Sequence, residues 1–123
     1  MNDTIRMSPE EDRLVHDVLF PCLNVAEEVI TLQTTSTLAR YIVQKIRSAR
    51  AKLAQAADHG SPLATVHKPL LDALRLSAEL IRTCSRYPAI NQIALDQIVQ
   101  TILVLDPGFR IDQPAAAAAG DIV

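Results

Sequence analysis

The segment between Arg86 and Asp106 most constrains the fold, because its only charged residue is Asp96. On a helical wheel its apolar residues fall on three sides: Ile90, Ala94, Ile98 and Leu105 on one, Leu95, Val99 and Ile102 on a second, Ile93 and Val104 on a third. A helix that is apolar nearly all round must be enclosed on more than one face. Other helices of the same chain, or a partner protein, must therefore pack against this helix.

The composition favours helices packed on helices. About half of the 123 residues are apolar, yet only 3% are aromatic, so the core must be built from Leu, Ile, Val and Ala. A chain of this length can bury one core and is too short for a second independent domain. We expect an all-α fold, a small bundle of three to four helices with one long helix.

The first helix is predicted to begin near Pro9. Ser8, Pro9 and Glu11 have the arrangement of an N-cap, a proline at the first helical position and the glutamate of a capping box. Pro21 lacks an amide donor and is expected to end or kink this helix.

A long helix is predicted over residues 25–57, with Asn24 as a fresh N-cap and Gly60 as its C-terminal stop. Within it, the segment 29–37 is rich in β-branched and hydroxyl residues and can also be interpreted as a strand. We favour the helix, because a lone strand would have no partner and the flanking periodicity is helical.

Two more helices complete the predicted domain over residues 8–106. The clearest runs through residues 70–84, and the last covers roughly residues 89–105. Residues 1–7 are predicted to be a flexible N-terminus. Residues 107–123 are predicted to be a low-complexity tail.

The residues that usually carry catalysis or bind metals do not form a recognisable pattern. The three histidines, His16, His59 and His67, occur in no spacing that puts two ligands on one helical face. Cys22 and Cys84 form no C-x-x-C pair, and the three glycines are too few for a phosphate-binding loop. We therefore expect no enzyme activity, no cofactor and no metal.

The N-terminal sequence is acidic and lacks the apolar run of a secretory signal, and no stretch reaches the length of an uninterrupted apolar span. We expect a soluble, cytoplasmic protein. Cys22 and Cys84 are accordingly expected to be reduced and to serve as small buried apolar residues.

The stretch 38–55 carries five cations and no carboxylate, although the net charge of the chain is only -2. Arg40, Arg47 and Arg50 share one side of the predicted helix, while Lys45 and Lys52 lie near the other border of its apolar stripe. A DNA-reading helix would gather its basic side chains on one surface. A small DNA-binding regulator that uses the three arginines is therefore the alternative interpretation, and ion pairing with the acidic first helix or contact with an acidic partner is preferred.

The surplus of apolar helix surface predicts association with another protein or with a second copy. Leaving three or four Leu or Ile side chains exposed would forfeit about 1.5 to 3 kcal/mol each. The expected self-contact is Leu95, Val99, Ile102 and Leu103 on the last helix. The expected partner-binding residues are Tyr41, Lys45, Arg47 and Lys52 on the long helix. The alternatives are a compact monomer in which the last helix is central, and a subunit of a larger closed assembly.

The runs EEVITLQTTSTLARYIVQKIRSARAKLAQA, residues 27–56, and LLDALRLSAELIRTC, residues 70–84, resemble the small helical quorum-sensing anti-activators. Proteins of that family bind the ligand-binding domain of a LuxR-type acyl-homoserine-lactone receptor. The resemblance covers most of residues 8–106 and assigns no site to individual residues. It implies an inhibitor that occupies the dimerisation surface of the receptor and so prevents it from holding its two-fold-symmetric DNA site. Together with the surplus of apolar helix surface, it leads us to expect a non-enzymatic regulatory protein that is itself a homodimer.

Overall fold

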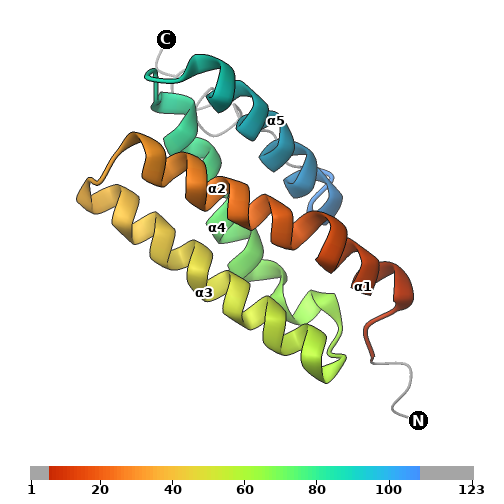
Figure 1. The fold of residues 1–123 in the computed structure, drawn as a ribbon. Helices are drawn as coiled ribbons and strands as arrows, with labels where there is room; N and C mark the ends of the chain where they lie inside the picture. The colour runs from red at the N-terminus through yellow and green to blue at the C-terminus, as the bar shows by residue number, and fades with distance from the viewer. Residues whose placement is uncertain (1–5, 109–123) are drawn as a thin grey trace.

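The computed structural model describes residues 6–108, and all regular structure in this range is helical (Figure 1). The predictions for residues 1–7 and 107–123 thus fall almost entirely outside the described residues. The elements are α1 (Pro9–Leu14), the π-helical turn η2 (Val15–Leu19), α2 (Phe20–Gln33), α3 (Thr37–His59), the 3-10 turn η3 (Leu63–Val66), α4 (His67–Thr83) and α5 (Pro88–Leu105). Since α1, η2 and α2 follow one another without a gap, the described chain forms four helices, and the predicted all-α fold is confirmed.

The first helix begins as predicted. The Glu11 amide donates to Ser8 Oγ at 3.1 Å, and the Ser8 amide donates to Glu11 Oε1 at 3.4 Å, which completes the capping box. The helical segment does not end at Pro21, but its regular α-helical geometry is interrupted just before this residue. The turn η2 precedes it, and the Phe20 amide bonds the Val15 carbonyl five residues back, so Pro21 falls in the first turn of α2, where an amide donor is dispensable.

The continuous long helix over residues 25–57 is also wrong, because the chain leaves the helix at Thr34 and re-enters it at Thr37. Hydroxyl side chains make this break favourable. The Ser36 hydroxyl accepts from the Ala39 amide at 3.1 Å as the N-cap of α3, and Thr34 Oγ1 accepts from the Ser36 amide at 3.1 Å. Asn24, the expected cap, lies exposed inside α2.

The C-terminal stop of α3 is as predicted, since Gly60 adopts a left-handed φ of 66°. The turn that follows is tied to the start of the chain. The Met7 amide donates to the Gly60 carbonyl at 2.6 Å, and the Leu63 amide donates to Glu11 Oε1 at 3.3 Å. The capping glutamate of the first helix therefore also holds the linker between α3 and α4.

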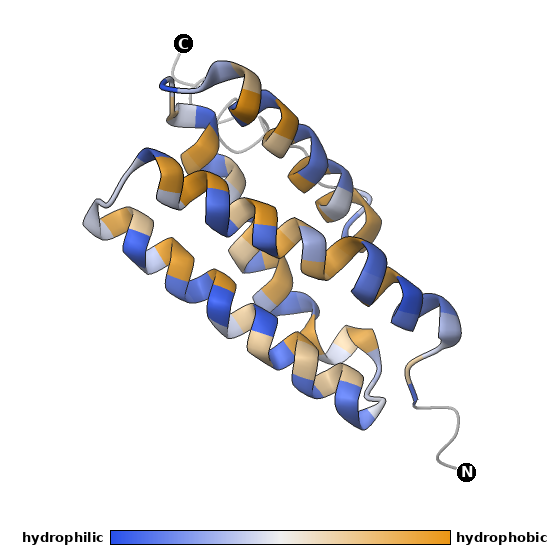
Figure 2. Cartoon of the chain, viewed as in Figure 1, coloured by the Kyte–Doolittle hydropathy of each residue, from blue (hydrophilic) through white to orange (hydrophobic). Residues whose placement is uncertain are grey.

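The central helix of the bundle is α4, which packs against α2, α3 and α5 (Figure 1). The helices turn their apolar residues toward one another, as the colouring in Figure 2 shows. The largest fully buried side chains are Leu19, Leu23, Ile30, Ile42, Ile46, Leu53, Leu70, Leu74, Ile81, Ile98 and Ile102. Both cysteines are free: Cys22 is buried, as expected, and burial raises the pKa of its thiol to about 11, whereas Cys84 is half-buried.

The position of α5 differs from that in the compact alternative, in which the last helix was central. It packs against α2 and α4 at one edge of the bundle, with one side buried (Figure 1). Buried Asn91 anchors its first turn: its side chain donates to the Cys84 carbonyl at 3.2 Å and accepts from Gln33 Nε2 of α2. The opposite side of α5 is not covered by any other described element of the chain.

Candidate functional site

The basic residues of α3 divide between two sides of the helix. On the side facing α2, Arg47 Nε donates to Glu27 Oε2 at 2.9 Å, and Arg50 binds the other oxygen of the same carboxylate. The hydrogen bond from Arg50, followed by that from Arg47, lowers the pKa of Glu27 against the opposing effect of its desolvation. Glu27 therefore joins α2 to α3.

This ion pair bears on the DNA-binding alternative, which required Arg40, Arg47 and Arg50 to converge on a nucleic acid. Two of the three guanidinium groups are held against α2 by Glu27. Arg40 donates from Nε to the Thr35 carbonyl at 3.2 Å, at the turn between α2 and α3. Glu27 lies in the segment that was predicted to belong to the long helix itself, so this ion pair differs from the predicted pairing with the acidic first helix.

The other side of α3 presents a surface strip, which we call the α3 strip: exposed Leu38, Tyr41 and Lys52, with half-buried Lys45 between them. Leu38 is 55% exposed and Tyr41 52% exposed, although both are large apolar side chains. The ammonium of Lys45 lies 5.7 Å from the centroid of the Tyr41 ring. No described carboxylate lies within 4 Å of Lys45 or Lys52.

Three of the four expected partner-binding residues, Tyr41, Lys45 and Lys52, thus share the α3 strip. The fourth, Arg47, lies on the α2 side of the helix with Glu27. Leu38 was missed at the sequence level, although its spacing of three residues from Tyr41 places it on the same side of a helix.

The expected self-contact on α5 is only partly accessible. Ile102 is fully buried in the core between α5 and its neighbours, so its assignment to a self-contact is wrong for this fold. Leu95, Val99 and Leu103 are half-buried. The uncovered side of α5 instead carries Ile93, which is 68% exposed, and Val104, which is 55% exposed.

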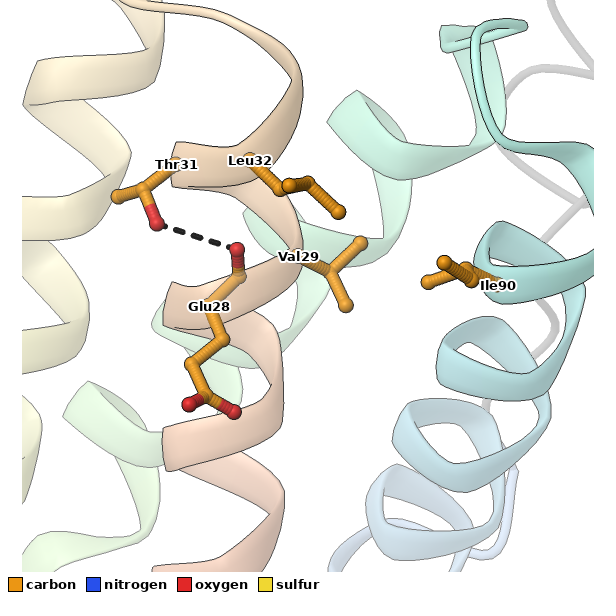
Figure 3. A pocket seen from close by; sticks show the side chains of 5 residues that line it. All are labelled: Glu28, Val29, Thr31, Leu32 and Ile90. Atoms are coloured by element: carbon orange, nitrogen blue, oxygen red, sulfur yellow. Dashed lines mark hydrogen bonds between the residues drawn. The ribbon is translucent and has the colours of Figure 1, made fainter.

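An open groove of about 450 Å³ separates the end of α2 from the start of α5 (Figure 3). Val29, Leu32 and Ile90 supply its apolar lining, and Figure 3 shows Leu32 and Ile90 on opposite sides. Thr31 donates its hydroxyl to the Glu28 carbonyl at 3.1 Å, so this polar group is already bonded to its own helix. The groove therefore offers apolar contact, with the Glu28 carboxylate at its border.

Groups that could hold a metal ion are not found among residues 6–108: no three His, Cys, Asp or Glu side chains cluster there. His16 lies 3.5 Å from Asp12, one helical turn away, and both are exposed. In the same range, α5 alone reaches the length and hydropathy of a membrane-spanning helix, a property that core helices of soluble proteins share. The cytoplasmic location stays a prediction.

Comparison with protein families, curated proteins and solved structures gives no match to this chain. The class of the protein is thus defined by its own geometry. It is a four-helix bundle whose described surface presents an aromatic and basic strip on α3 and the exposed apolar residues Ile90, Ile93 and Val104 on α5. Surfaces of this kind serve contact with other proteins.

Proposed function

We propose that the protein is a non-enzymatic regulator that binds a LuxR-type transcription factor and blocks its dimerisation and DNA binding. The observation that carries this proposal is the α3 strip, where Leu38 and Tyr41 are exposed beside two lysines that pair with no carboxylate among residues 6–108. The resemblance of residues 27–56 and 70–84 to quorum-sensing anti-activators supports the choice of target.

The chemistry of the α3 strip favours one kind of occupant. Tyr and other large apolar side chains bind well at the centre of protein interfaces, because they bury much area at a small cost in side-chain entropy. The contact with Lys45 restrains the Tyr41 ring before binding. Lys45 and Lys52 add positive charge at the border, so the complementary surface is an amphipathic helix of the receptor with carboxylates beside its apolar face.

Inhibition by this route requires no catalytic group. A receptor that holds a two-fold-symmetric DNA site needs two copies of its DNA-binding domain at a set spacing. If the regulator covers the receptor helix that forms the dimer contact, the receptor remains monomeric and loses the second half-site. The regulator then acts stoichiometrically, by mass action.

The proposal is tested by titrating the purified ligand-binding domain of a LuxR-type receptor and measuring the Kd by calorimetry. Replacing Tyr41 by Ala or Lys45 by Glu should weaken binding about tenfold or more, the effect of losing an interface residue worth about 1.4 kcal/mol. Ala51→Glu, an exposed position on α3 that is turned about 80° or more around the helix from Tyr41, Lys45 and Lys52, is the matched control.

Equal affinity for the receptor domain in wild type, Tyr41→Ala and Lys45→Glu, or no binding by the wild type, contradicts the proposal. Binding of the protein alone to duplex DNA, with an affinity that falls steeply as salt rises, would support the DNA-binding alternative. In that case Arg40→Ala should weaken binding and Tyr41→Ala should not.

A further inference from the structure

The outward side of α5 carries a row of uncharged residues, which we call the α5 strip: Ile90, Ile93, half-buried Gln97, Gln100 and Val104. Exposed Asp96 borders this strip next to Gln100. These positions follow the three-and-four spacing of one helical face. Leu32, exposed on α2 across the groove shown in Figure 3, extends the apolar area near the start of α5. A helix of 18 residues is about 27 Å long, and the strip follows most of α5.

The order of residues along the α5 strip is complementary to itself when two copies run antiparallel. In the register that brings Ile93 against Val104 of a second copy, Gln97 meets Gln100 of that copy. Each amide has both donors and an acceptor, so glutamines can pair with one another across a two-fold axis. An isologous contact of this kind uses the same surface on both copies.

Charges at the two ends of α5 favour the antiparallel arrangement. Exposed Arg86 precedes the helix, and Asp106, which also binds Arg75, follows it. Antiparallel pairing brings each Arg86 toward Asp106 of the other copy, and it sets the helix dipoles in opposite directions. Parallel pairing would put like charges together at both ends.

The size of the strip sets the strength of this contact. A helix face about 27 Å long and about 10 Å wide is smaller than the ~800 Å² per partner of a standard stable interface. Contacts from Leu32 and the adjoining surface of α2 enlarge it modestly. A second copy is therefore expected to bind reversibly, with a monomer–dimer equilibrium that depends on protein concentration.

We infer that the α5 strip is the self-association surface of the protein, occupied by a second copy in antiparallel orientation with Ile93 against Val104. This inference goes beyond the proposed function, because it concerns α5 and not the α3 strip. Either can fail without the other.

The test introduces opposite charges at Ile93 and Val104 and measures the dimer Kd of the full chain by sedimentation velocity. The protein concentration runs from about 1 µM to 1 mM, a range that brackets weak dimers. Ile93→Lys and Val104→Glu should each raise the dimer Kd at least tenfold. The double variant should recover most of the lost affinity, because each lysine then meets a glutamate of the other copy. Within one chain the two positions lie about 16 Å apart along the helix, too far for an internal ion pair.

The matched control is Leu38→Lys, an equally exposed apolar position on α3, which should leave the dimer Kd unchanged. A monomeric wild type throughout the concentration range overturns the inference, as does a dimer that tolerates both single variants. Failure of the double variant to recover contradicts the antiparallel register. Flotation of the wild type with phosphatidylcholine vesicles, lost in Ile93→Lys, would identify a lipid surface as the occupant instead.

Discussion

At the scale of single residues, Glu27 connects helices that the sequence separates. Its carboxylate accepts from Arg47 and Arg50 and lies mostly buried between α2 and α3. These contacts lower its pKa from the ordinary value of 4.5. A carboxylate with a lowered pKa stabilises the folded state above its unfolded pKa, and this stabilisation is lost as the pH falls through its folded pKa.

We therefore expect Glu27→Gln to lower the free energy of unfolding by about 1 to 2 kcal/mol at pH 7, because Arg50 loses its charged acceptor. The difference from wild type should shrink as the pH falls below about 4.5, where the wild-type carboxylate also begins to be protonated. Urea unfolding at a series of pH values measures both effects.

Glu28→Gln is the matched control, since this neighbouring side chain is exposed and forms no ion pair within the described chain. It should leave stability unchanged at every pH. A loss in Glu27→Gln that is as large at pH 3 as at pH 7 would show that packing, and not the ion pair, is responsible.

At the scale of elements, the attachment of α5 depends on one buried amide. Asn91 bonds the Cys84 carbonyl and the Gln33 side chain, so it joins the first turn of α5 to the ends of α4 and α2. Replacing Asn91 by Ala should lower the free energy of unfolding by about 1 to 3 kcal/mol, because the Cys84 carbonyl loses the Asn91 donor and Gln33 Nε2 keeps only its bond to the Val29 carbonyl.

Denaturant unfolding measures this loss, and Gln92→Ala serves as the control. Gln92 is exposed and bonds only Asp96 on its own helix, at 2.8 Å, so its removal should cost less than about 0.5 kcal/mol. Similar losses in the two variants would contradict the anchoring role of Asn91.

The helices show how far local sequence determines the elements. The capping box at Ser8 and the stop at Gly60 were predictable, because each depends on residues within one turn. The break after Gln33 was not. At Pro21, the π-helical turn η2 lets the helical segment continue past the proline. After Gln33, the hydroxyls of Thr34 and Ser36 accept hydrogen bonds from backbone amides and so stabilise a break between helices, which the hydrophobic periodicity of the sequence does not reveal.

At the scale of the whole molecule, exposure on α5 depends on which neighbours pack against it. A wheel of this helix shows three apolar sides, and it cannot tell which of them α2 and α4 will cover. Packing buries Ile102 and leaves Ile93 and Val104 outside, so the self-contact predicted from the wheel was partly misplaced. On α3 the apolar stripe was clear, and three of the four expected partner residues lie together for that reason.

If copies pair through α5, the stability of the molecule should depend on its concentration. The thermal midpoint of the wild type should rise as protein concentration increases, because association favours the folded state by mass action. Calorimetric scans over a hundredfold range, about 5 µM to 500 µM, measure this rise. Ile93→Lys should remove it, and a midpoint independent of concentration in the wild type would contradict dimer formation in this range.

The bond between the start of the chain and the linker after α3 has a consequence for how the bundle opens. Glu11 accepts from the amides of both Ser8 and Leu63, and Met7 bonds the Gly60 carbonyl. If the first turn of α1 unfolds, the Leu63 amide in the linker therefore loses its hydrogen-bond acceptor at the same time. These two segments, more than fifty residues apart in sequence, should fray as one cooperative unit.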